Sequence, residues 1–153
     1  MINSIKISTI SNATEDEEKI LDAISYFIPD VIDEEDIDME VIETEGCFGN
    51  PINIYSAKLK NKKAKITYDY IINMLKQNEK NVENLKNDVD LRIEKNALYL
   101  RFDKQKAYLN ECILSDGDDT VRVLIKFKLF KPSGKEEEVK RIILERLDSK
   151  SVF

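Results

Sequence analysis

The chain has 153 residues, 42% of them hydrophobic and 35% charged, which is typical of one domain built around a single core. Its formal net charge is −6, but residues 1–50 hold 14 acidic and 2 basic residues, leaving a net charge of +6 for residues 51–153, where we expect an anionic partner to bind. No apolar stretch is long enough to span a bilayer and residues 1–6 lack the apolar core of a secretion signal, so we expect a soluble, cytoplasmic protein without membrane contact.

The first third of the chain predicts a strand, a helix and an acidic connection. Apolar and polar residues alternate over residues 5–8, as in a strand with one buried face. Thr14 and Glu17 are spaced as a capping box, and apolar residues then recur at helical spacing as far as Pro29. The acidic run 33–36 predicts a solvated connection.

Two strands and a basic cluster follow. Residues 37–41 alternate in polarity, residues 46–51 form a turn cluster rich in Gly, Asn and Pro, and residues 52–60 predict the returning strand. This strand ends in the densest basic cluster of the chain, at a predicted strand-to-helix junction. The cluster consists of Lys58, Lys60, Lys62, Lys63 and Lys65. The structural alternative is a solvated helix start, although cations there oppose the helix dipole.

The remaining elements alternate between helices and strands. Residues 68–75 have helical spacing, and residues 82–89 predict either its continuation or a second short helix. Residues 91–93 predict a strand that pairs, through a turn at 95–96, with a strand over 97–103. A further strand is predicted over residues 120–130.

A last helix is predicted after Pro132, where Ser133 and Glu136 have the spacing of a capping box. The order is then strand, helix, two strands, helical segment, three or four strands, helix. This order predicts an α+β fold in which one antiparallel or mixed sheet carries helices on one face, with residues 1–153 as a single domain.

The strands over 97–103 and 120–130 each have one apolar and one polar face. Tyr99 and Arg101 lie on the polar face of the first, and Arg122 on that of the second. Exposed Arg and Lys pair with phosphates, and unpaired bases stack on aromatic rings, so this face predicts RNA binding. Two structural alternatives exist: the cations only solubilise the sheet, or Arg101, Asp103 and Arg122 pair across strands and set its register.

The same residues carry a family resemblance. Residues 98–108, followed by 116–119 and Arg122, resemble a family of small archaeal predicted RNA-binding proteins, and residues 13–19 and 49–52 occur in that family's order and approximate spacing. The family is commonly described as exosome-associated, and its fold resembles that of the large-subunit ribosomal protein that binds 5S rRNA. The resemblance therefore implies a non-catalytic, RNA-binding role in RNA processing, RNA degradation or ribosome-related metabolism.

Two departures from the family pattern are visible. Cys47 and Phe48 precede Gly49 where a short polar or aromatic residue such as His or Tyr is expected, and an Asn-rich segment lengthens the central helical region. From the residues and the resemblance together we expect phosphate contacts from eight cations and base stacking on one of two tyrosines. These residues are Lys58, Lys60, Lys62, Lys63, Arg101, Lys104, Lys106, Arg122, Tyr99 and Tyr108.

Catalysis is not expected, and neither is a cofactor or a metal. The chain has no His and no Gly-rich phosphate loop, so Ser and Cys nucleophiles lack their usual base. Asp116, Asp118 and Asp119 resemble a metal-binding cluster for phosphodiester cleavage, but Asp and Gly are also the usual residues of a turn, which we favour. Cys47 and Cys112 are expected as reduced, partly buried thiols, with a disulfide in an oxidising compartment as the alternative.

A second function class is a protein-interaction module. Here the acidic segment from Glu15 to Glu45 docks on a basic partner, such as an RNA-processing or ribosomal protein. The two functions are compatible, with one surface for each. Pairing of two copies through a free sheet edge also remains open.

Overall fold

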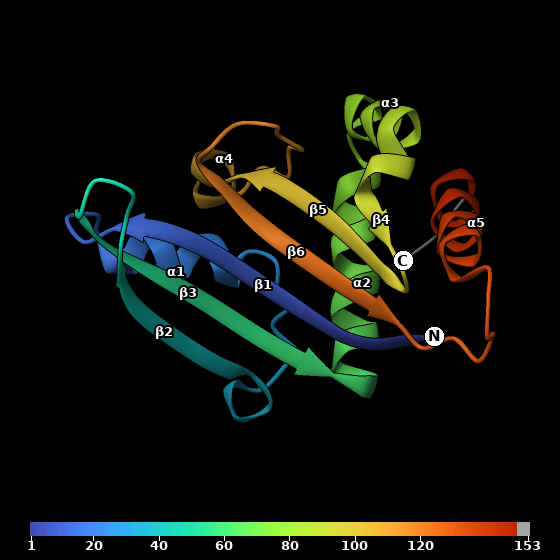
Figure 1. Cartoon of the computed structure of the whole chain (residues 1–153), viewed down its shortest axis with the longest axis horizontal. Coiled ribbons are helices and arrows are strands. Elements are labelled where there is room, and N and C mark those ends of the chain that lie inside the picture. Colours follow the sequence, from blue (N-terminus) through green and yellow to red (C-terminus); the bar gives the residue numbers. More distant parts are fainter. Residues whose placement is uncertain (150–153) are drawn as a thin grey trace.

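A computed structural model describes residues 1–149 and contains one six-stranded antiparallel sheet in the order β2-β3-β1-β6-β5-β4 (Figure 1). The strands are β1 (Ile2–Asn12), β2 (Asp38–Glu45), β3 (Pro51–Lys60), β4 (Ile93–Glu94), β5 (Ala97–Asp103) and β6 (Thr120–Phe127). The central strand β1 pairs with β3 on one side and with β6 on the other. The predicted α+β fold with a single antiparallel sheet is confirmed.

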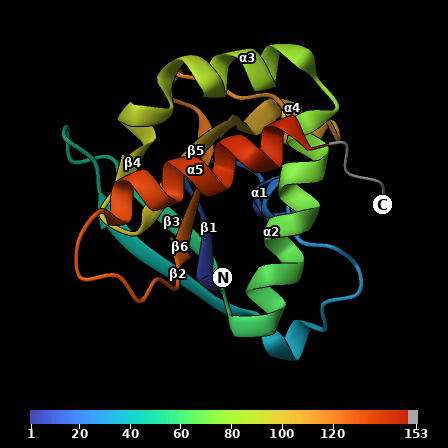
Figure 2. The same cartoon turned by 90° about the vertical axis from the view of Figure 1, so that its right-hand side faces the viewer.

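Residues 1–149 also contain five α-helices. They are α1 (Glu17–Ser25), α2 (Asn61–Lys76), α3 (Glu79–Asp88), α4 (Lys104–Tyr108) and α5 (Lys135–Asp148). Figure 1 shows α1 and α2 behind the sheet, and Figure 2 shows α3 and α5 beside the β4 edge. Within residues 1–149 no helix combines the length and apolar character needed to cross a membrane.

The period-two alternation of the strands places the core on the helix side of the sheet. The central strands bury alternate residues there, and α2 packs against them with Ile71, Ile72 and Leu75. The buried sheet residues include Ile5, Ile7, Leu98, Leu100, Phe102, Val121, Val123, Ile125 and Phe127. The residues between them therefore point to the opposite side, which α1 and α2 do not cover (Figure 1).

Both predicted capping boxes are wrong. Helix α1 begins at Glu17, and the Asp16 side chain caps it by accepting a hydrogen bond from the Glu18 N–H, since β1 and a turn extend further than expected. Helix α5 follows Gly134, which adopts a φ of 72° and provides no side-chain cap, so Ser133 lies outside the helix. A backbone turn replaces the expected side-chain cap there.

Other boundaries also differ from the sequence pattern. Of the two alternatives for the helical region, the second short helix is confirmed: the region divides into α2 and α3, and the Asn78 side chain caps α3 by accepting a hydrogen bond from the Lys80 N–H. The strand predicted near residue 91 is mainly a 3-10 helix, Val89–Arg92, and only two residues pair in β4. The turn at 95–96 is confirmed, whereas the strand predicted to residue 130 ends at Phe127.

Helix α4 was not predicted. It follows β5 directly because the Asp103 carboxylate accepts a hydrogen bond from the Lys106 N–H and so caps its first turn. A loop then leads to β6, with one isolated bridge between Phe102 and Leu114. The turn at residues 116–119 is therefore the end of a longer connection and not a simple hairpin.

Candidate nucleic-acid interface

Five cations lie together on the sheet face that α1 and α2 leave open. Lys6 of β1 is directly opposite Lys58 of β3, and directly opposite residues of an antiparallel pair lie on the same face. Lys60 is opposite Ser4, as is Lys126 of β6, and Arg122 is opposite Ser8. Lys6 is therefore diagonal to Lys60, Arg122 and Lys126, and all five side chains are exposed. We name these five residues the basic surface.

None of the five residues of the basic surface forms an ion pair within residues 1–149. Many cations elsewhere do, for example Arg92 with Asp88 at 2.9 Å and Lys140 with Asp90 at 2.9 Å. Like charges directly opposite one another destabilise a sheet. The basic surface is thus an arrangement that folding alone does not favour and that bound anions would neutralise.

An aromatic ring continues the same face toward β5. The row that contains Lys6 runs through Leu124 of β6 to Tyr99 of β5, which is 43% exposed. Arg101 lies one row further and directly opposite Arg122. Its guanidinium donates to the Gly117 carbonyl over 2.6 Å, so part of this side chain holds the loop before β6.

Lys62 and Lys63 lie at the rim of the basic surface, in the first turn of α2. Asn61 adopts a φ of 54°, a conformation that Asn tolerates better than most residues, and turns the chain from β3 into the helix. Lys62 is exposed, whereas Lys63 forms an ion pair with Asp36 at 3.5 Å.

Lys104 lies away from the basic surface and is only 2% exposed. Its ammonium donates to the Ile10 carbonyl over 3.0 Å and is 2.7 Å from Asp119 and 3.4 Å from Glu15. Burial opposes ionisation of Asp119, but hydrogen bonds from Gln105 and Lys104 outweigh it, so the pKa of this carboxyl is lowered. The structure gives Lys104 a buried structural position, out of reach of an external phosphate.

Lys106 and Tyr108 also lie apart from the basic surface, on α4, which packs against α1. The Lys106 ammonium is 3.5 Å from Glu111. Tyr108 is half-buried, and the Lys19 ammonium lies 5.2 Å from the centre of its ring. Of the two predicted stacking residues, only Tyr99 lies on the open face.

Cross-strand pairing of Arg101, Asp103 and Arg122 is not what the structure shows. The two arginines oppose each other, and Asp103 instead caps α4.

In the acidic turn, Asp116 accepts a hydrogen bond from Arg92 over 3.0 Å. Within residues 1–149 no group of three or more Cys, Asp or Glu side chains is placed to hold a metal ion.

The two cysteines differ in environment. Cys112 is buried as expected, and burial raises the pKa of its thiol to about 12. The expectation of a partly buried Cys47 is wrong, because the hairpin turn between β2 and β3 exposes it. Both are free thiols in the structure, so they form no disulfide with each other.

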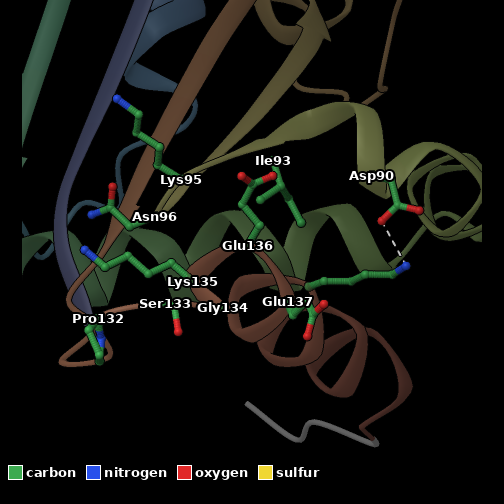
Figure 3. A pocket seen from close by; sticks show the side chains of 11 residues that line it. Asp90, Ile93, Lys95, Asn96, Pro132, Ser133, Gly134, Lys135, Glu136 and Glu137 are labelled. Atoms are coloured by element: carbon green, nitrogen blue, oxygen red, sulfur yellow. Dashed lines mark ion pairs between the residues drawn. The ribbon is translucent and has the colours of Figure 1, made fainter.

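A cavity of about 740 Å³ lies elsewhere, between the start of α5 and the β4–β5 hairpin (Figure 3). An ion pair of 2.9 Å joins Asp90 and Lys140 at its side, and Figure 3 shows Glu136 pointing toward Ile93. Its lining mixes acidic and basic side chains. This cavity therefore lacks the concentration of positive charge that is found on the basic surface.

Sequence reasoning missed the centre of the basic surface. Lys6 belongs to the acidic first third of the chain, yet four cations from β3 and β6 surround it. The alternation of residues 5–8 placed Lys6 on a polar strand face, but the neighbours of that strand are far away in sequence. Three exposed or half-buried isoleucines were also missed; Ile42, Ile54 and Ile10 form one row across β2, β3 and β1.

Proteins of known sequence and structure match nearly the whole chain. An uncharacterized protein of Methanocaldococcus jannaschii is 52% identical over 147 residues, covering 96% of this chain and 99% of that protein. A protein of Pyrococcus abyssi named as RNA-binding is 40% identical over 143 residues, covering 92% and 90%. The crystal structure of a protein from Archaeglobus fulgidus has a TM-score of 0.77 at 28% identity and covers 95% of this chain and 99% of that one.

A family model described as RNA binding matches residues 4–127. This span begins before Lys6 and ends after Lys126, so it includes every residue of the basic surface. The chain therefore belongs to the RNA binding family.

Proposed function

We propose that this protein binds RNA on the open face of its sheet, through the basic surface. The observation that carries this proposal is the placement of five exposed cations at opposite and diagonal positions, none of which forms an ion pair in the described part of the chain. Phosphates supply the missing negative charge. The membership in the RNA binding family supports RNA as the polyanion.

The open face favours unpaired RNA over a continuous duplex. Tyr99 lies two strands from Lys6 in the same row, so a base on its ring leaves the adjoining phosphates over the cations. Neighbouring strands are about 4.8 Å apart, which puts the ring about 10 Å from the Lys6 strand. Stacking needs an exposed base face, and single strands, loops and bulges provide it.

The biological setting that we propose is RNA processing or degradation in association with the exosome, or ribosome-related metabolism. The resemblance of residues 98–108 and 116–119 to the archaeal family supports this setting, as it supports a fold related to the 5S-rRNA-binding ribosomal protein. We propose a non-catalytic role, in which Asp116 and Asp119 hold the loop through their ion pairs with Arg92 and Lys104.

The test is fluorescence anisotropy with a labelled single-stranded RNA and a duplex of the same length. Each phosphate contact to a single strand contributes about −0.7 to the slope of log K against log salt concentration, so five contacts predict a slope of about −3.5. Affinity for the single strand should then fall about 100-fold between about 50 mM and about 200 mM salt.

A variant with all five residues of the basic surface changed to glutamine should lose this binding. The control carries the same five-charge change outside the basic surface, on α3, α5 and the connection before α5, at Lys80, Lys86, Lys131, Lys135 and Lys140. The control should retain the affinity and salt slope of the wild type apart from a small long-range effect. Equal loss in both variants, or no binding at about 50 mM salt, would overturn the proposal.

Metal-dependent cleavage of RNA is the weaker alternative to RNA binding without catalysis. Its candidate residues are Asp116, Asp118 and Asp119, of which only Asp118 forms no ion pair within residues 1–149. RNA incubated with the protein and Mg²⁺ or Mn²⁺ should remain intact. Cleavage that disappears in Asp118→Asn would instead establish catalysis.

A further inference from the structure

Strand β2 forms a long free edge of the sheet. All eight of its residues pair with β3 in continuous register, and its other side has no neighbouring strand within residues 1–149. The opposite edge, β4, has only two residues and lies beside α5. Figure 1 shows β2 at the outer border of the sheet, away from α3 and α5.

The acidic side chains are the one common form of edge protection that β2 has. Proteins protect free edges with proline, inward-pointing charges, lysine or a bulge. Strand β2 contains no proline and no lysine, and its register with β3 has no shift. Every residue of β2 is exposed, including Met39 at 45%, Val41 at 49% and Ile42 at 45%.

Charge determines which partner fits this edge. Residues 33–45 contain eight acidic and no basic residues, and one of them, Asp36, forms an ion pair with Lys63. Four of the acids lie on β2 itself: Asp38, Glu40, Glu43 and Glu45. A second copy of β2 would oppose acids to acids, whereas a basic strand would place cations between them.

We propose that β2 accepts an extended segment of a partner protein, with alternating basic and aliphatic residues, as a seventh strand of the sheet. Main-chain hydrogen bonds to the free edge hold the segment, and its cations meet the acids of β2. Its aliphatic side chains lie on one face and cover Met39 and Val41, and its cations lie on the other face beside Asp38 and Glu40. The site lies at the sheet edge and does not depend on RNA binding by the basic surface.

The experiment uses a synthetic eight-residue peptide in which Lys or Arg alternates with Val or Ile. A second peptide has the same sequence but N-methyl groups on alternate backbone nitrogens, which keep the charge and abolish one ladder of hydrogen bonds. Calorimetry should give at least about tenfold weaker binding for the methylated peptide. Hydrogen exchange should slow at the β2 amides when the unmodified peptide binds.

Charge variants separate this site from general attraction to an acidic protein. The double variant Asp38→Lys/Glu40→Lys reverses the two acids on the face that meets the cations of the peptide and should weaken binding at least about tenfold. The control Glu79→Lys/Glu83→Lys makes the same charge change on exposed residues of α3 and should retain binding. Equal affinity of both peptides, equal effects of both double variants, no binding, or sedimentation as a dimer closed through β2 would each overturn the proposal.

Discussion

Replacing Lys6 with glutamine should stabilise the fold, because Lys6 lies among four cations and has no carboxylate partner in residues 1–149. Lys58 is directly opposite, while Lys60, Arg122 and Lys126 are diagonal. A directly opposed like-charge pair costs about 0.2–1 kcal/mol, and the diagonal charges add less. We therefore expect Lys6→Gln to raise the free energy of unfolding by about 1 kcal/mol at low salt, and the melting temperature by about 2–4 °C.

The matched comparison is Lys58→Gln. Lys58 lies in the same row between Lys6 and Asp38, so it experiences repulsion on one side and attraction on the other. Its removal should change the free energy of unfolding by less than about 0.5 kcal/mol. Both variants should lose RNA affinity, because each removes a phosphate contact.

Urea unfolding followed by circular dichroism, in low salt and in about 0.5 M NaCl, measures these effects. The stabilisation from Lys6→Gln should shrink in high salt, since the screening length falls from about 10 Å at about 0.1 M to a few ångströms near 1 M. A double-mutant cycle of the two variants should give a repulsive coupling between Lys6 and Lys58. Destabilisation by Lys6→Gln, or a coupling of attractive sign, would refute the reasoning about the basic surface.

Three further predictions concern residues outside the basic surface. Asn81 is 1% exposed and makes three hydrogen bonds of 2.7–3.2 Å to backbone groups, so Asn81→Ala should lower the free energy of unfolding by about 2–4 kcal/mol in urea titrations. The pKa of Asp119 is lowered in the folded protein, so its ionised carboxylate stabilises the fold above the unfolded carboxyl pKa of about 3.9. This stabilisation is lost as the pH falls through the folded pKa. The variant Asp119→Asn should therefore lose less stability than the wild type between about pH 6 and about pH 2. Iodoacetamide should alkylate exposed Cys47 in the folded protein but Cys112, whose buried thiol has its pKa raised to about 12, only after unfolding, as read by mass spectrometry.

Local patterns predicted most of the elements, because they depend on neighbouring residues. Alternation located β5 and most of β6 and divided each correctly into a buried and an exposed face, whereas β3 was predicted from the turn cluster that precedes it. Helix starts were less predictable. The spacing of Thr14 and Glu17 matched a capping box, but continued pairing of β1 with β3 placed Thr14 in a turn before the helix.

In the candidate site, too, the features that depend on neighbouring residues were predictable, whereas those that depend on contacts between distant residues were not. Tyr99 and Arg122 were assigned to an exposed face from alternation alone, and the structure places both there. Lys104 has the same residue type and lies in the same part of the chain, but its ammonium is buried beside Asp119 and Glu15. Sequence spacing does not reveal this, because Glu15 and Lys104 meet only when α1 packs against α4.

The division of charge between the first and second parts of the chain is a property of the amino-acid order. The basic surface is not, since its central residue, Lys6, comes from the acidic part. Side-chain alternation orients each strand residue within its own strand, whatever that strand pairs with. Pairing between distant strands sets the neighbours, and it brought Lys58 and Lys126 beside Lys6 because β1 lies between β3 and β6.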